Sequence, residues 1–289
     1  VDGQQLLIRQ AVVPGENVRA RGQDIAPGDL VLPAGRRLLA QDLGVLASVG
    51  CAKVRVYRPL SVAILSTGDE LVDPGAAQLQ PGQIFNSNRY TLHGLLSDLG
   101  MRVIDFGVVQ DSADATARTL SEAAAAADCV ISSGGVSVGE EDYVKNEVER
   151  LGELRLWKLR IKPGKPLAYG RIGNSAFFGL PGNPAAVFVT FLLLVRPWLL
   201  RAQGAAESSP LLLPARADFE ISRAGGRQEY LRVRVEVRDG TLCAGLHPNQ
   251  SSGVLSSVSW ANALAVIPPQ TTVTPGDQVQ VLLLDQLSR

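Results

Sequence analysis

Three short apolar segments of this 289-residue chain run directly into loops that are rich in glycine and polar side chains. The segments with their loops read SVAILSTGDEL at 61–71, DCVISSGGVSVGEEDYVK at 128–145 and NSAFFGLPGNPAA at 174–186. Continuous apolar runs of this length are typical of strands that are buried on both faces of a parallel sheet. In such sheets, ligands bind beyond the carboxyl ends of the strands, where the order of winding reverses. Each loop is a weak signal by itself, but together they predict one shared ligand-binding crevice.

The order of apolar and helical patterns indicates the class of fold. Strand-like runs lie at 62–65, 103–109, 129–131 and 154–161, and they alternate with helical patterns near 89–99, 113–127 and 141–150. This alternation predicts βαβ units with right-handed crossovers. We therefore expect an α/β fold, in which a mostly parallel sheet is flanked by helices.

Composition divides the chain into three expected domains. Residues 58–204 carry the α/β pattern, and residues 205–289 change to short alternating segments that predict a smaller C-terminal β-domain. Those short segments are 229–237, 241–245, 264–267 and 279–284. Residues 1–57 form an N-terminal β and linker region, with β-like pieces around 5–13 and a short helix near 41–50.

The three loops carry groups that suit an anionic ligand. Gly134 and Gly135 permit positive φ angles, so several backbone N–H groups can converge on one anion. The other loop candidates are Thr67, Gly68, Asp69, Ser132, Ser133, Ser137, Pro181, Gly182, Asn183 and Pro184. Glu140, Glu141 and Asp142 would repel a phosphate unless a divalent cation such as Mg²⁺ lay between them. The alternative is an ordinary turn before an acidic helix start, because acids there favour the helix dipole.

Positive charge is concentrated in WKLRIKPGKPLAYG at 157–170. In a strand, Lys158, Arg160 and Lys162 would share one face. The functional interpretation is that Lys158 and Lys162 neutralise an oxyanion or phosphate, with Lys165 assisting after the Pro-Gly turn. The alternative is the solvated face of an edge strand, where lysine blocks aggregation.

Charge and composition exclude several classes of partner. The formal net charge is zero, so the sequence predicts no nucleic-acid partner and no anionic membrane surface. The three cysteines are odd in number and lie far apart in apolar settings, which favours a reducing, cytoplasmic location. We expect no membrane span, because Arg196 and Pro197 interrupt the longest apolar run.

The assembled motifs resemble the molybdopterin molybdenumtransferase family, the bacterial MoeA-type enzymes related to the gephyrin E domain. The matching segments are STGDEL at 66–71, NSNR at 86–89, ISSGGVSVGEEDY at 131–143, WKLRIKPGKP at 157–166 and GLPGNP at 179–184. RGQDI at 21–25, LPAG at 32–35 and HPNQSSGVLSS at 247–257 agree in order and spacing. The resemblance implies Mg²⁺-dependent insertion of molybdate into adenylylated molybdopterin with release of AMP, by a homodimer supplied by molybdopterin adenylyltransferase.

The resemblance also implies roles for individual residues. The positions that match functional residues of the family are Glu70, Asp111, Asp142 as the Mg²⁺-linked acid, Lys158, Lys162, Pro181 and Pro184. The pterin and nucleotide would lie on the loops at 132–135 and 179–183.

Two alternatives and one departure accompany this resemblance. The alternatives are a molybdopterin adenylyltransferase, which would lack the regions outside 59–203, and a non-catalytic scaffold domain of the gephyrin kind. The departure is a domain-sized N-terminal segment of the family, with an Asp-Gly and a Thr-Gly motif, that is absent here. We expect the chain to bind its ligand without that segment but to turn it over slowly.

Overall fold

The computed structural model describes residues 3, 9–11, 13–76, 78–136 and 143–287. The chain forms two compact units, one of residues 57–204 and 208–289 and the other of residues 1–56 and 205–207. The larger unit contains both the α/β sheet and the C-terminal β-structure. The expected boundaries at 57 and 204, and the division into three domains, stay predictions.

The first sheet of the larger unit has the strand order β4-β1-β5-β9-β8-β6. Its strands are β1 (Ser61–Thr67), β4 (Arg102–Val109), β5 (Cys129–Ser133), β6 (Gly152–Lys158), β8 (Pro166–Ile172) and β9 (Ser175–Leu180). The first four strands of that order are parallel, as predicted, and β8 and β6 add an antiparallel edge. The α/β fold is therefore confirmed.

The antiparallel edge differs from the expected βαβ repeat. The expected strand at 154–161 ends at Lys158 as β6, and it pairs with β8, which the sequence analysis did not single out. Only residues 159–165 connect the two strands. A parallel pair needs a crossover of about a dozen residues or more, so this short connection forces an antiparallel pair.

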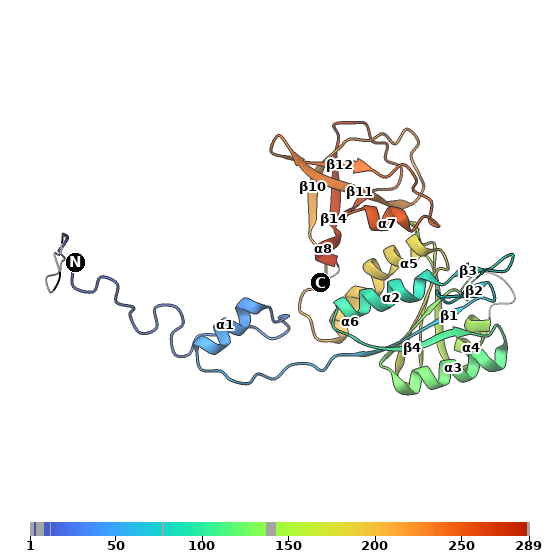
Figure 1. Ribbon diagram of the computed structural model, residues 1–289, viewed down its shortest axis with the longest axis horizontal. Helices are drawn as coiled ribbons and strands as arrows, with labels where there is room; N and C mark the ends of the chain where they lie inside the picture. The colour runs from blue at the N-terminus through green and yellow to red at the C-terminus, as the bar shows by residue number, and fades with distance from the viewer. Residues whose placement is uncertain (1–2, 4–8, 12, 77, 137–142, 288–289) are drawn as a thin grey trace. The chain divides into compact units, whose positions relative to one another are not determined.

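Helices cover both faces of this sheet (Figure 1). α2 (Ser87–Asp98) and the continuous helix of α5 (Pro184–Thr190), η1 (Phe191–Val195) and α6 (Arg196–Ala202) pack on one face. α3 (Ala113–Ala126) and α4 (Tyr143–Leu151) cover the other face. The helices expected at 89–99 and 113–127 are confirmed; that at 141–150 is confirmed from 143, since 141 and 142 lie outside the described residues.

The helix Pro184–Ala202 is long and apolar enough to cross a membrane by length and composition. This differs from the expectation of no such run. More than half of it is buried inside the fold, at 56%. Arg196 within it is buried and donates to the carbonyl oxygens of Ser208 at 3.3 Å and Gln286 at 3.0 Å. Its place in the protein core accounts for its apolar composition.

The second sheet of the larger unit is formed mainly by residues 208–289. Its order is β12-β10-β14-β13-β11-β7, and the additional pairing of β12 with β11 closes it into a small barrel. The strands are β7 (Ile161–Lys162), β10 (Leu212–Ala217), β11 (Gln228–Arg238), β12 (Thr241–Leu246), β13 (Ala263–Ile267) and β14 (Gln278–Leu283). The predicted β-domain is confirmed. Two short helices, α7 (Ser256–Trp260) and α8 (Leu284–Leu287), accompany it.

The smaller unit contains one helix among its described residues, α1 (Ala40–Ser48), which confirms the helix expected near 41–50. Most of the β-like stretch expected around 5–13 lies outside the described residues, and residues 9–11 and 13 form no strand.

Candidate functional site

The carboxyl ends of three neighbouring strands meet at one edge of the first sheet. From β1 the chain passes outward to β4 and then returns to the other side of β1 as β5, so the winding reverses between β1 and β5. Ser66 pairs with Ser133 across this point, and Ser133 pairs with Leu180 of β9. The three loops singled out in the sequence therefore begin side by side.

The glycine loop after β5 packs tightly against the end of β1. Gly134 and Gly135 have φ angles of +88° and +66°, which favour glycine. A Cβ atom at Gly134 would lie 2.8 Å from the carbonyl oxygen of Thr67, and one at Gly135 would lie 2.5 Å from Val144 Cγ2. Ser132 supports the turn from behind, because its hydroxyl donates to the Gly134 carbonyl at 2.9 Å. Larger residues would push the loop off the strand end.

A cleft of about 980 Å³ lies over these strand ends. Most of the site residues predicted from the sequence line this cleft. They are Thr67, Gly68, Glu70, Asp111, Ser133, Gly134, Gly135, Lys162, Lys165, Pro181, Gly182, Asn183 and Pro184. Three predicted residues, Asp69, Ser132 and Lys158, are not among the described residues that line it. Ser137 and Asp142 lie outside the described residues. The structure thus gathers most of the sequence candidates around one cavity.

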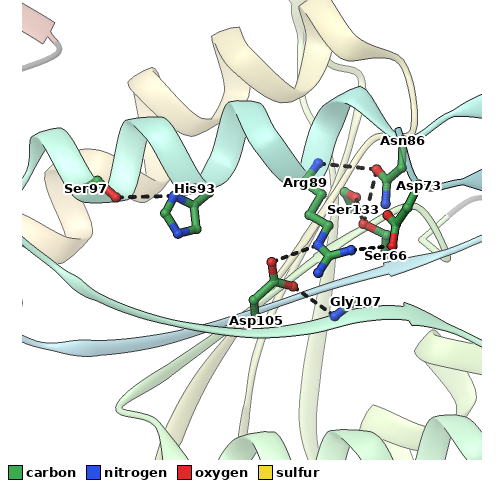
Figure 2. A network of polar contacts seen from close by, with 9 residues as sticks. All are labelled: Ser66, Asp73, Asn86, Arg89, His93, Ser97, Asp105, Gly107 and Ser133. Carbon is green, nitrogen blue, oxygen red and sulfur yellow. Dashed lines mark hydrogen bonds and ion pairs between the residues drawn. The ribbon is translucent and has the colours of Figure 1, made fainter. Parts of the chain in front are cut away.

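Three buried polar atoms in the cleft wall lack a hydrogen-bond partner among the described residues. They are Thr67 Oγ1, Asn86 Nδ2 and Asn88 Oδ1. The rest of each asparagine amide is engaged: Asn86 Oδ1 accepts from the Arg89 amide at 3.3 Å, and Asn88 Nδ2 donates to the Gly182 carbonyl at 2.7 Å. Figure 2 shows Asn86 beside Ser66 and Ser133. Buried polar groups are normally hydrogen-bonded, so these atoms indicate a polar ligand.

Asn86 and Asn88 were expected only as part of the NSNR motif at 86–89, and not as ligand contacts. Asn86 is the N-cap of α2. Its place in the cleft wall involves a contact with Ser66, which lies 20 residues away in the sequence, so local sequence carries no signal for it.

The basic segment is not a single strand, which corrects the expectation for Lys158, Arg160 and Lys162. β6 ends at Lys158 in the first sheet, and β7 begins at Ile161 in the second sheet, where it pairs with β11. The three cations therefore do not share one strand face. Lys162 reaches the cleft and also contacts Glu229 at 3.2 Å, whereas Lys158 is exposed at the end of β6.

Two further parts of the cleft wall come from the barrel and were missed by the sequence analysis. Arg227 is half-buried, donates to the Ile161 carbonyl at 3.2 Å and lines the cleft beside Lys162 and Lys165. The loop of Gln250, Ser251 and Ser252 also lines the cleft. In the sequence this loop stands out only as part of the motif at 247–257. It is far in sequence from the α/β loops, so its position beside them in the cleft could not be predicted.

The fully buried Arg232 holds that barrel loop in place. Its guanidinium donates to the Ser251 carbonyl and the Ser257 hydroxyl, each at 3.1 Å, and its amide donates to Gln250 Oε1 at 2.9 Å. Burial lowers the pKa of Arg232. The loop also contacts the start of α5, since the Ala185 amide donates to the Ser252 carbonyl at 2.9 Å.

The acids Glu70 and Asp111 approach the cleft from the ends of β1 and β4. Glu70 folds back over Gly68, where a Cβ atom would lie 2.6 Å from Glu70 Oε2. Among the described residues, no group of three or more His, Cys, Asp or Glu side chains is placed to hold a metal ion. Two carboxylates nevertheless suffice for Mg²⁺ when substrate phosphates complete its coordination.

A mostly parallel sheet with a glycine loop and a cleft at its winding reversal, joined to a small barrel, defines an α/β protein of the kind that binds ligands at the carboxyl ends of its strands. The model of the probable molybdopterin binding domain matches residues 63–201. The models of the MoeA C-terminal region (domain IV) and N-terminal region (domains I and II) match residues 214–284 and 1–50.

Relatives and solved structures agree with these matches. The chain is 44% identical over 220 residues to the molybdopterin molybdenumtransferase of Haemophilus influenzae, covering 76% of this chain and 54% of that protein. It is 41% identical over 281 residues to that of a Nostoc species, covering 94% and 64%. A MoeA structure from Pyrococcus horikoshii matches with a TM-score of 0.77 and 33% identity, covering 91% and 64%.

The chain belongs to the MoeA family of molybdopterin molybdenumtransferases. It spans between about half and two thirds of the length of these relatives.

Proposed function

We propose that this chain acts in molybdenum cofactor biosynthesis, inserting molybdate into adenylylated molybdopterin with release of AMP. The observation that carries the proposal is the meeting of Lys162, Lys165 and Arg227 with the glycine loop on one cleft. Molybdate and the phosphates of the nucleotide are both anions. The Gly134 amide donates to the Leu180 carbonyl at 3.1 Å, so the three cations are the main groups that would bind these anions, and they suit a ligand with two such groups.

The three buried polar atoms that lack a hydrogen-bond partner among the described residues support a polar heterocycle as the rest of the ligand. Asn86 offers a donor, Asn88 offers an acceptor, and Thr67 offers a hydroxyl that can do either. A pterin edge carries both donors and acceptors, so this mixed set suits it better than a phosphate, which only accepts. The loops at 132–135 and 179–183 would then hold the pterin and nucleotide.

The side chains of this cleft can assist AMP release by electrostatic stabilisation. Breaking a phosphoanhydride bond leaves added negative charge on the departing phosphate. Lys162, with Lys165 and Arg227 beside it, would stabilise that charge in a site held in place before reaction. Lys158 is not among the described residues that line the cleft. Its proposed role in neutralising an oxyanion or phosphate therefore rests on the family resemblance alone.

Mg²⁺ fits the acidic side of the cleft. Glu70 and Asp111 supply hard carboxylate oxygens there, and Asp142, which lies outside the described residues, would be the third acid. When bound, Mg²⁺ would neutralise phosphate charge as a Lewis acid. Replacement of Asp142 by Asn should therefore abolish Mg²⁺-dependent AMP release while leaving the thermal midpoint nearly unchanged.

The expected partners and location belong to the same proposal. The upstream supplier would be a molybdopterin adenylyltransferase, and the working form a homodimer in the cytoplasm. Exposed apolar side chains in the smaller unit, among them Val13, Val18, Leu30 and Leu43, support a contact with a second chain. The three free cysteines agree with a reducing compartment.

The test is AMP release from adenylylated molybdopterin, measured with molybdate, tungstate or sulfate as the oxyanion and with or without Mg²⁺. We expect AMP release and cofactor formation with molybdate and Mg²⁺, and no cofactor with sulfate. Binding of adenylylated molybdopterin without AMP release under any condition would refute the transferase activity and favour a scaffold role. Transfer of AMP onto molybdopterin would favour the adenylyltransferase alternative.

A further inference from the structure

Arg89, in the first turn of α2, bridges two carboxylates that belong to different elements (Figure 2). Its Nε atom lies 2.7 Å from Asp105 Oδ2 in β4. Its Nη1 atom lies 2.7 Å from Asp73 Oδ2, directly after the short strand β2 (Leu71–Val72). The side chain is largely shielded, with 23% of its surface exposed. These hydrogen bonds raise the pKa of Arg89 above its usual value.

Asp105 also fixes an irregularity in β4. The pairing of β1 with β4 shifts register, because Ile64 pairs with Asp105 whereas Ser66 pairs with Val108. The extra residue is accommodated at Gly107, which has a φ angle of +72°. The Gly107 amide donates to Asp105 Oδ1 at 2.9 Å, so Asp105 uses one oxygen for this bulge and the other for Arg89. Bulges of this kind redirect the strand that follows.

Each element that Arg89 joins continues into the cleft. Glu70 directly precedes β2, and Asp111 follows the end of β4. β2 is also linked to the start of α2, because the backbone N–H of Asn86 donates to the Val72 carbonyl at 2.9 Å. Arg89 itself is not among the described residues that line the cleft. It lies behind the wall that carries both acids.

We propose that Arg89 is a positioning residue that fixes the Glu70 and Asp111 loops relative to each other and to the asparagines at the start of α2. Loss of either contact would release the loop that carries Asp73 from the strand that carries Asp105. Arginine suits this task because its planar group offers separate donors in fixed directions, which one lysine ammonium cannot reproduce. The inference rests on the proposed function for what the two acids do.

The test uses Arg89→Lys and Asp105→Asn in the whole chain. Arg89→Lys keeps the charge but loses the fixed pair of donors. Asp105→Asn keeps an oxygen that can accept from Gly107 but removes the charge opposite Arg89. The matched control is Arg238→Lys, because Arg238 also bridges two acids, Glu236 and Asp218, on the barrel surface away from the cleft.

Two measurements separate positioning from a structural role. The first is amide hydrogen exchange in peptides covering 68–75 and 104–112, without ligand. We expect faster exchange of both peptides in Arg89→Lys and Asp105→Asn, and no change there in Arg238→Lys. The second is AMP release, for which we expect kcat to fall at least tenfold in Arg89→Lys and in Asp105→Asn while KM for adenylylated molybdopterin changes less than threefold.

The outcomes are distinct. Faster exchange with unchanged kcat would overturn the proposal, because the ion pairs would then stabilise the loops without affecting the acids. Unchanged exchange in either peptide would also overturn it. A wild-type chain without AMP release would contradict the proposed function instead, and the exchange measurement would still decide whether Arg89 fixes the two loops.

Discussion

The hydroxyl oxygens of Ser66 and Ser133 lie 3.1 Å apart on neighbouring parallel strands that both end at the cleft. Both serines are buried, and Ser66 also contacts Asn86 Oδ1 at 3.5 Å. This chain of polar contacts joins the floor of the cleft to the start of α2. Asn86 Nδ2, which lacks a partner among the described residues, is therefore held in place before any ligand arrives, which reduces the entropy lost on binding.

Replacing Thr67 by Val tests whether its buried hydroxyl belongs to the ligand site. Removing a hydroxyl without a partner among the described residues should change the free energy of unfolding by less than about 1 kcal/mol, or stabilise the fold. Affinity for adenylylated molybdopterin should fall about tenfold, which corresponds to ~1.4 kcal/mol. Calorimetry and thermal unfolding measure both quantities. The control is Thr190→Val, since Thr190 has a similarly unpaired buried hydroxyl but is not among the described cleft-lining residues. Equal affinities in all three proteins would remove Thr67 from the site.

Replacing Gly135 by Ala should disturb the glycine loop. The new Cβ atom would lie 2.5 Å from Val144 Cγ2 and 2.8 Å from Thr67 Oγ1, in a residue with positive φ. We expect a loss of about 2 to 4 kcal/mol in the free energy of unfolding and weaker ligand binding. Gly173→Ala isolates the backbone effect, because Gly173 also has positive φ but has no atom within 4 Å of the added Cβ. It should cost only about 1 to 2 kcal/mol. Equal losses in denaturant titrations would show that the predicted contacts do not form.

Lys162→Ala and Lys158→Ala separate the two lysines that the sequence treats alike. Lys162 lines the cleft, whereas Lys158 does not do so in the described part of the chain. Initial rates of AMP release at varied molybdate concentration should therefore fall at least tenfold in Lys162→Ala and less in Lys158→Ala. Loss of the exposed contact between Lys162 and Glu229 should change the free energy of unfolding by less than about 1 kcal/mol. A larger kinetic effect of Lys158→Ala would contradict the cleft as described.

Asp128 should make stability depend on pH. Hydrogen bonds from Arg58 lower the pKa of Asp128 below its ordinary value of 3.8, and the Ser61 amide adds to the effect. Because the pKa in the folded state lies below that in the unfolded state, the stabilisation is fully present above about pH 5. It is lost as the pH falls through the folded-state pKa. Thermal midpoints of the wild type and Asp128→Asn should therefore differ most above about pH 5 and converge in acid. A constant difference across the range would exclude this contribution.

The parallel sheet and its loops could be predicted because their signals are local. Apolar runs such as 129–131 and the glycines that follow them define strand, turn and loop within a few residues. The pairing of β6 with β8, the place of β7 and the contribution of Arg227 were not predicted. The place of β7 and of Arg227 depends on contacts between residues 161–162 and 228–229, which are far apart in sequence. The pairing of β6 with β8 is local, but it was missed because residues 154–161 were assigned to one continuous strand. Alternating charge at 158–162 indicates one extended segment and gives no sign that the segment changes sheets.

The position of β7 has a practical consequence for dissecting this protein. Lys162 belongs by sequence to the α/β part of the chain but is fixed by its pairing with Glu229 on the barrel strand β11. A fragment that ends at Gly204 would retain the glycine loop and Lys162 but would lack β11, Arg227 and the Ser251–Ser252 loop. Such a fragment should therefore recognise the heterocyclic part of the ligand better than its anionic part, so the two halves of substrate recognition can be separated by truncation.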